Sequence, residues 1–165
     1  MKVKKRKFTS SNKPKAIDLF AGCGGLTTGL KGAGFDVVGA VEIDTKAAII
    51  YKSNHKNTPV WNFSIRDVSA KDVAKYAGLR PGQLDLLAGC PPCQGFSRIT
   101  THNGLYSVDD PRNDLINDFL RFVEDLKPKA VLLENVPGLG STGRYRTFCK
   151  RLTELGYKVT WDILD

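Results

Sequence analysis

Short apolar runs and amphipathic stretches alternate along almost the whole chain, and this alternation constrains the fold more than any other feature. The apolar runs predict strands at Ala16–Ala21, Val37–Val41, Val60–Phe63, Leu84–Ala88, Ala130–Leu133 and Lys158–Leu164. The stretches between them predict helices at Leu26–Gly32, from Thr45 as a cap to Asn54, from Ser69 or Lys71 to about Gly78, at Arg112–Leu126 and at Tyr145–Leu155. Such alternation is typical of an α/β fold, in which helices cover both faces of a mostly parallel, doubly wound sheet.

Length and charge favour one domain with a basic tail. The 165 residues fit the usual size of a single domain, and no apolar run reaches the ~18 residues of a membrane span. Seven of the 25 Lys and Arg residues lie in residues 1–15, which contain no acid, while the other 18 nearly balance 17 Asp and Glu. The tail is therefore either a contact for a phosphate backbone or a flexible, solvated start to the domain at residues 16–165. Without an export signal, the four cysteines are expected to be thiols in a cytoplasmic protein.

A glycine turn and an acid at neighbouring strand ends predict a nucleoside cofactor. The segment Asp18-Leu-Phe-Ala-Gly22-Cys-Gly-Gly25 joins the first strand to a helix whose N-terminal N–H groups are available to an anion. Glu42 ends the second strand, where an acid accepts hydrogen bonds from ribose hydroxyls. The pair does not separate NAD from S-adenosylmethionine (AdoMet). Asp67, placed just past the third strand, is either a partner of the adenine amino group or a surface aspartate.

The segment Gly89-Cys90-Pro91-Pro92-Cys93-Gln94-Gly95-Phe96-Ser97 follows the fourth strand directly. Two prolines remove N–H donors and stiffen the chain, which holds the sulfur of Cys93 at the sheet edge. A redox pair or a structural zinc site is a weaker interpretation of the C-x-x-C spacing, because the segment opens a loop late in the chain and no second ligand pair has zinc-like spacing. The following residues, 95–111, predict a long loop, and loops of this length inside a compact domain are usually either functional or disordered.

Glu134-Asn135-Val136 follows the fifth strand. An acid at the end of an apolar strand tends to be desolvated, which raises the pKa of its carboxyl group and suits a proton donor. The alternative is a Glu that caps a helix or pairs with an Arg.

In order and spacing, these motifs resemble those of the DNA (cytosine-5) methyltransferases over residues 16–165. The Asp18–Gly25 turn, Pro91-Pro92-Cys93-Gln94-Gly95-Phe96-Ser97 and Glu134-Asn135-Val136 are similar to that family's motifs I, IV and VI. The resemblance implies the Rossmann-like fold of AdoMet-dependent methyltransferases, with AdoMet rather than NAD as the expected cofactor. It also implies double-stranded DNA as partner, methylation in restriction–modification, a nucleoid-associated location and no metal.

The resemblance also assigns chemical roles. Cys93 would add to C6 of a flipped-out cytosine, Glu134 would share a proton with N3, and Asn135 and Pro92 would hold the loop. The implied cofactor residues are Asp18, Phe20, Ala21, Gly22, Gly24, Gly25, Glu42, Ile43, Asp67, Val68 and Leu115. Ile43 departs from the larger or aromatic side chain of many members. Ser97, Arg98 and Arg112 are the implied DNA contacts.

The sequence departs from the family after residue 165. The Gln-x-Arg-x-Arg strand, the target-recognition region and the final segment of complete members are not present in it. In the family fold that strand lies between the fifth strand and the last one here, so the resemblance predicts a gap in the sheet. Three hypotheses follow: a catalytic part completed by a second chain, a truncated or relic copy, or a module that binds AdoMet or DNA without turnover.

Overall fold

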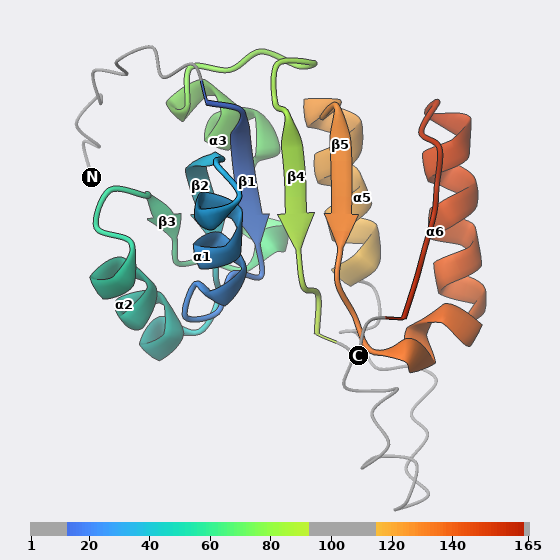
Figure 1. Ribbon diagram of the computed structural model, residues 1–165, viewed down its shortest axis with the longest axis horizontal. Coiled ribbons are helices and arrows are strands. Elements are labelled where there is room, and N and C mark those ends of the chain that lie inside the picture. Colours follow the sequence, from blue (N-terminus) through green and yellow to red (C-terminus); the bar gives the residue numbers. More distant parts are fainter. Residues whose placement is uncertain (1–12, 93–114, 164–165) are drawn as a thin grey trace, which may run out of the picture.

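Five parallel strands form the centre of the domain in the computed structural model, which describes residues 13–92 and 115–163 (Figure 1). The strands are β1 (Lys15–Leu19), β2 (Asp36–Val41), β3 (Val60–Trp61), β4 (Leu86–Gly89) and β5 (Ala130–Leu133). Their order across the sheet is β3-β2-β1-β4-β5, and every pairing is parallel. The expected α/β class with a doubly wound parallel sheet is confirmed.

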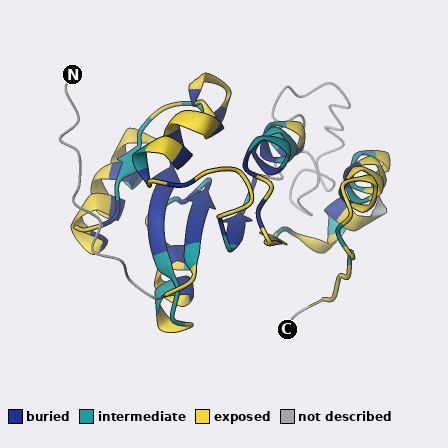
Figure 2. Cartoon of the chain, turned by 90° about the horizontal axis from the view of Figure 1, so that it is seen from above, coloured by how far each residue is buried: buried dark blue, intermediate teal, exposed yellow. Residues whose placement is uncertain are grey.

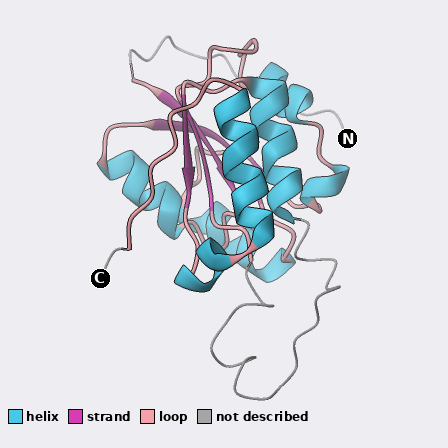
Figure 3. Ribbon diagram, turned by 90° about the vertical axis from the view of Figure 1, so that its right-hand side faces the viewer, coloured by secondary structure: helices cyan, strands magenta, loops and turns pink. Residues whose placement is uncertain are grey.

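Helices cover both faces of this sheet (Figure 3). They are α1 (Gly25–Gly32), α2 (Thr45–Asn54), α3 (Ala70–Tyr76), α5 (Leu115–Leu126) and α6 (Gly143–Glu154), together with the 3-10 turns η1 (Ile65–Asp67) and η3 (Pro137–Ser141). None of the helices in residues 13–92 and 115–163 is long and apolar enough to cross a membrane.

The alternation of side chains along β1 explains why both faces are covered. Ile17 and Leu19 enter the larger core cluster with residues of α3, α5 and α6, whereas Ala16 packs on the other face with Leu30 of α1. Because successive side chains of a strand point to opposite faces, a strand that is apolar on both sides needs a helix layer on each. Apart from the first residues of β1 and β2, the central strands β1, β2 and β4 are accordingly buried, as the dark colour in Figure 2 shows.

Local chemistry sets the ends of several elements, and some differ from expectation. β1 ends at Leu19, two residues early, because Phe20 has a left-handed φ of 58° that no strand can include. Asp44, not Thr45, caps α2: its carboxylate accepts a hydrogen bond from the N–H of Ala47 at 2.8 Å. Ser69 caps α3, one of the two expected starts. β3 is shorter than predicted, and residues 112–114 and 95–111 lie outside the described part.

The predicted last strand, Lys158–Leu164, is wrong for the residues that the structure describes. Residues 157–163 form no ladder with any strand. A strand needs a hydrogen-bonding partner, and here a groove of about 410 Å³ separates the segment from β5. Val131 and Leu133 of β5, Phe148 and Leu152 of α6, and Val159 are among its lining residues. β5 is therefore the exposed edge of the described sheet, with Leu132 42% exposed.

The close approach of β1, β4 and α5 at Gly89 generates a stability prediction. A Cβ atom at Gly89 would lie 2.7 Å from the carbonyl oxygen of Leu19 and 3.0 Å from the Phe119 ring. Because the first of these is backbone, Gly89→Ala is expected to lower the free energy of unfolding by about 1–3 kcal/mol in urea titrations. Gly29→Ala in the exposed face of α1, where nothing lies within 4 Å, is the control and should raise it by about 0.5–1 kcal/mol. Equal effects of the two changes would contradict this packing.

Candidate active site

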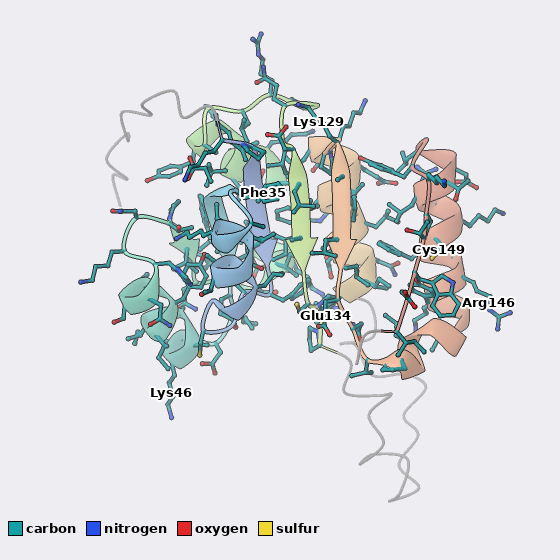
Figure 4. All side chains as sticks on the ribbon, viewed as in Figure 1. Phe35, Lys46, Lys129, Glu134, Arg146 and Cys149 are labelled. Carbon is teal, nitrogen blue, oxygen red and sulfur yellow. The ribbon has the colours of Figure 1, made fainter. Side chains whose placement is uncertain are left out.

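All five strands end in one row. Parallel pairing places Trp61 beside Val41, Val41 beside Leu19, Leu19 beside Gly89, and Gly89 beside Leu133. The residue that directly follows each strand end comes from a different part of the sequence. These residues are Phe20, Glu42, Asn62, Cys90 and Glu134. Figure 4 shows Glu134 at the edge where β4 and β5 end. The sheet therefore brings the glycine turn, the second-strand acid, the proline segment and Glu134 to one edge.

The turn after β1 has left-handed backbone at every second residue. Phe20, Gly22 and Gly24 have φ values of 58°, 53° and 95°. At Gly24 a Cβ atom would lie 2.3 Å from Nε2 of His55, so this position has no room for a side chain. No side chain caps the N-terminus of α1 at Gly24. The turn therefore presents backbone N–H groups at a helix start, which suits an anionic group.

Glu42 fixes this turn against β2. Its Oε2 accepts a hydrogen bond from the N–H of Gly22, and its Oε1 accepts one from the N–H of Asp44, both at 2.7 Å. Asn62, which follows β3, donates its side-chain amide to the carbonyl oxygens of Glu42 and Ile43 at 2.9 and 3.1 Å. Glu42 is buried at 9% exposure. Both of its oxygens keep a second acceptor position, so the carboxylate is oriented and still able to bind hydroxyl donors.

Asp18 is the buried acid of the site. Its side chain is 0% exposed, and Oδ2 accepts a hydrogen bond from Thr27 Oγ1 at 2.6 Å. Within the described residues, Oδ1 is the buried side-chain oxygen or nitrogen that has no partner. Desolvation raises the pKa of Asp18 from 3.8 to about 6, and nearby Glu42 adds to the shift, although the hydrogen bonds from Thr27 oppose it.

Cys90 and Glu134 meet across β4 and β5. The N–H of Glu134 donates to the carbonyl oxygen of Gly89 at 3.1 Å. Burial raises the pKa of the Cys90 thiol to about 12, and its hydrogen bond and proximity to Glu134 add to the shift. Asn135 donates its side-chain amide to the carbonyl oxygen of Pro91 at 2.8 Å, which ties the turn after β5 to the proline segment. The burial expected for Glu134 is absent, because a position directly past an exposed edge strand lacks a neighbour on one side.

The other sequence-predicted residues are less closely grouped. Ile43 is 67% exposed beside Glu42, Ala21 and Gly25 belong to the turn and the start of α1, and Leu115 begins α5. Asp67 is exposed in η1 and Val68 is buried, six and seven residues after β3. Arg121 of α5 holds this segment by hydrogen bonds to the carbonyl oxygens of Ile65 and Val68 at 2.6 and 3.2 Å.

Among the expected catalytic and DNA-contact residues, Pro92 is exposed. Cys93, Ser97, Arg98 and Arg112 lie outside the described residues.

Sequence reasoning missed the polar residues behind the turn: Thr27, Tyr51, His55 and Asn62. For Thr27 and Tyr51 the signal was a polar residue on an inward helix face, as at Thr27 one turn before Leu30. His55 and Asn62 follow the ends of α2 and β3 and have no such signal. No group of three His, Cys, Asp or Glu able to hold a metal occurs in the described residues.

Comparisons with known proteins agree on one family. The family model for C-5 cytosine-specific DNA methylase matches residues 14–165. The chain is 40% identical over 154 residues to the type II methyltransferase M.XorII of Xanthomonas oryzae, covering 91% of this chain and 35% of that protein. It is 44% identical over 125 residues to the type II methyltransferase M.AgeI of Thalassovita gelatinovora, covering 76% of this chain and 28% of that protein. The chain thus spans about a third of the length of these relatives.

Solved structures give the same result. A putative DNA modification methyltransferase from an Escherichia coli prophage superposes with a TM-score of 0.68 at 34% identity, over 86% of this chain and 37% of that one. DNMT2 of Spodoptera frugiperda superposes with a TM-score of 0.65 at 29% identity, over 86% of this chain and 41% of that one. The Rossmann-like fold of AdoMet-dependent enzymes is therefore confirmed.

The buried Asp18 generates a prediction about stability and pH. Its folded pKa of about 6 lies above the ordinary 3.8, so its contribution to stability is present below about pH 4 and is lost as pH rises to about 6. Two pKa units correspond to about 3 kcal/mol. The free energy of unfolding of Asp18→Asn is therefore expected to exceed that of the wild type by about 1–3 kcal/mol at pH 7. Between pH 4 and 6 it should also fall by less than that of the wild type.

Urea unfolding at several pH values measures this difference. Asp36→Asn, at a partly exposed aspartate at the other end of a neighbouring strand, is the matched control for the Asp-to-Asn substitution itself. A variant Asp18→Asn that is less stable than the wild type at pH 7 would contradict the assignment.

Proposed function

Because the chain belongs to the family of C-5 cytosine-specific DNA methylases, we propose that it is the cofactor-binding and catalytic part of a DNA (cytosine-5)-methyltransferase. Such an enzyme would transfer a methyl group from AdoMet to C5 of cytosine in double-stranded DNA, within a restriction–modification system. The single observation that carries the proposal is the common row of strand ends, which brings the glycine turn, Glu42 and Glu134 to one edge.

The residues at this edge fit AdoMet. The unpartnered, buried Oδ1 of Asp18 offers an anionic acceptor for the ammonium group of the methionine moiety. The uncapped start of α1 at Gly24 and Gly25 suits its carboxylate. Glu42 is held in place for the ribose hydroxyls, and Phe20, Ala21 and Gly22 line the turn. Ile43, Asp67, Val68 and Leu115 complete the proposed cofactor residues around the adenine. When bound, AdoMet supplies an electrophilic methyl group.

Cys93 is the proposed nucleophile. C5 of cytosine is a poor nucleophile, and addition of the Cys93 thiolate to C6 would make the ring electron-rich at C5. Glu134 would share its proton with N3, so that negative charge does not build up on the ring during addition. After methylation, loss of the C5 proton and departure of Cys93 would restore the double bond. The raised pKa of Cys90 supports this choice between the two cysteines, since Cys90 stays a neutral thiol near pH 7.

The contact between Asn135 and Pro91 supports the proposed role of the proline segment. The 2.8 Å hydrogen bond joins the residue after Glu134 to the residue before Pro92. It therefore couples the position of the acid to that of the segment that leads into Cys93. Asn135 and Pro92 act in this proposal by fixing the relative positions of the two reacting groups.

The DNA side of the proposal rests on the family. A cytosine within a duplex must leave the base stack before its C6 is accessible, at a cost of a few kcal/mol. Ser97, Arg98 and Arg112 are the proposed phosphate contacts, and the seven basic residues of the tail would add counterion-release affinity.

We also propose that a second chain completes the enzyme with the target-recognition region. The support is the exposed apolar edge of β5 and the adjoining groove, which is wide enough to separate residues 157–160 from the sheet. A strand entering there would pair with β5 and bury this edge, which otherwise favours aggregation.

A trapping experiment tests the function and the nucleophile together. Duplex DNA containing 5-fluorocytosine cannot release its C5 substituent as a proton, so a covalent adduct persists on a denaturing gel. With AdoMet, this chain, assayed alone and co-expressed with the reading frame that follows it, is expected to form the adduct in at least one preparation. Cys93→Ser is expected to form none, and Cys90→Ala is the matched control that keeps it.

Methyl transfer to ordinary duplex DNA gives the rates. Glu134→Gln is expected to lower kcat by about 10²–10⁴, the usual contribution of a proton-transfer group. Activity that requires the second product would support a split enzyme. AdoMet binding without adduct or transfer in either preparation would instead establish a relic or a binding module. An adduct that persists in Cys93→Ser would overturn the mechanism.

A further inference from the structure

Four buried side chains form a hydrogen-bonded series that ends at Asp18. Thr27 Oγ1 donates to Asp18 Oδ2 at 2.6 Å, and the Tyr51 hydroxyl lies 2.8 Å from the same Thr27 oxygen. Thr58 hydrogen-bonds to Tyr51 in turn. Asp18, Thr27 and Tyr51 are 0% exposed and Thr58 is 5% exposed. The series therefore crosses from the segment after α2, through α2 and α1, to the strand β1, entirely inside the protein.

The direction of these hydrogen bonds follows from the number of protons. A hydroxyl group has one proton, and an ionised carboxylate can only accept. Because Thr27 gives its proton to Asp18, the proton between Thr27 and Tyr51 must come from Tyr51. Burial raises the pKa of the Tyr51 phenol, so Tyr51 keeps the proton that it donates. Tyr51 and Thr27 thus both donate toward Asp18, and the series stabilises negative charge on one carboxylate oxygen.

His55 fixes the glycine turn from the same side. Its ring lies 4.8 Å from that of Tyr51, and its Nε2 is 2.9 Å from the carbonyl oxygen of Gly24. Lys31 Nζ lies 3.3 Å from Nδ1. Since an ammonium group can only donate, Nδ1 accepts and Nε2 donates its proton to Gly24. Tyr51 therefore contacts both Thr27, which donates to the acid of the site, and His55, which packs under the turn.

We propose that Thr27 and Tyr51 are positioning residues for the cofactor: Thr27 donates to Oδ2 of Asp18 and Tyr51 to Thr27, which orients the carboxylate so that Oδ1 can accept the ammonium group of the methionine moiety of AdoMet. This inference rests on the proposed function and adds residues that no sequence motif indicated. Neither residue touches the ligand in this arrangement. Both act through Asp18, whose side chain is fixed by α1 and α2 rather than by its own strand.

The inference implies a pH dependence that can be measured. The groups facing Asp18 are Thr27 of α1, Tyr51 of α2, Glu42 after β2 and Cys90 after β4. A protonated Asp18 must lose its proton before it can pair with an ammonium group. Affinity for AdoMet should therefore increase as pH rises through about 6 and reach a plateau before pH 7.5. Loss of a donor to the carboxylate raises its pKa, so a variant lacking one should show the same curve displaced to higher pH.

The test is the dissociation constant of AdoMet between pH 5 and 7.5, measured by calorimetry on the full chain. Thr27→Val is expected to weaken binding at pH 6.5 by about tenfold or more, the usual effect of losing a hydrogen bond to a charged group, and to displace the curve upward. Tyr51→Phe keeps the ring and should give a smaller displacement in the same direction. Thr27→Ser restores the hydroxyl and should restore the wild-type curve.

Two controls separate positioning from general packing. Tyr76→Phe removes a phenol hydroxyl from α3, on the opposite face of the sheet, and should leave the curve in place. The second control is a ligand, 5′-methylthioadenosine, which lacks the amino and carboxylate groups of AdoMet. Its affinity should not depend on pH through Asp18 and should be the same for wild type, Thr27→Val and Tyr51→Phe.

The outcomes distinguish this inference from the function on which it rests. Wild-type protein that binds AdoMet at no pH, either alone or co-expressed with the reading frame that follows it, would overturn both. Wild-type binding with unchanged curves in Thr27→Val and Tyr51→Phe would overturn the positioning role alone. Equal weakening at every pH, not rescued by Thr27→Ser and shared by 5′-methylthioadenosine, would show a packing effect and overturn it too. If Thr27→Val fails to fold by circular dichroism, Tyr51→Phe against Tyr76→Phe decides the question.

Discussion

The in-register parallel pairing of five strands is the constraint on which the rest of the structure depends. Parallel strands that end together place their following residues side by side, however far apart these are in the chain. Here the row from Trp61 to Leu133 delivers Glu42, Phe20, Cys90 and Glu134 to one edge. Backbone hydrogen bonds continue beyond the row, by one residue from Glu134 to Gly89 and by two residues from Ala21 to Val41, so the site begins on rigid backbone rather than on free loops.

That rigid edge carries an electrostatic cost. Asp18 sits inside the sheet with one oxygen paired and the other unpartnered in the described residues, and its raised pKa shows that its charged form is disfavoured there. Cys90 is held neutral by the same burial and by the acids nearby. The buried carboxylate of Asp18 lowers the stability of the free protein, and a cationic group of the ligand would compensate its charge. The loss of stability and the proposed affinity for the zwitterionic methionine moiety therefore both come from the same buried charge.

In the described part of the chain, the edge strand β5 lacks a neighbouring strand on one side. β5 is apolar yet half-exposed, and residues 157–163 run beside α6 without joining a ladder. The hydrophobic pattern Ala130–Leu133 and the pattern Lys158–Leu164 are equally strand-like in sequence. Only the first has a neighbour in β4, with which it forms four register pairs. Strand propensity alone does not form a strand when no neighbouring strand is available for hydrogen bonding. The groove beside β5 and the missing ladder therefore have the same cause.

The amino-acid sequence by itself determined the order of strands and helices, because hydrophobic periodicity and glycine turns are local properties of the chain. It also determined which motifs follow which strands, and so that Asp18, Glu42 and Glu134 would meet at one edge. It did not predict the burial of Asp18, the exposure of Glu134 or the contacts of Thr27, Tyr51 and His55. These depend on which helix packs over which strand and on whether an edge strand has a neighbour. Desolvation and hydrogen-bond partners are properties of the space around a side chain, and only the tertiary structure decided them.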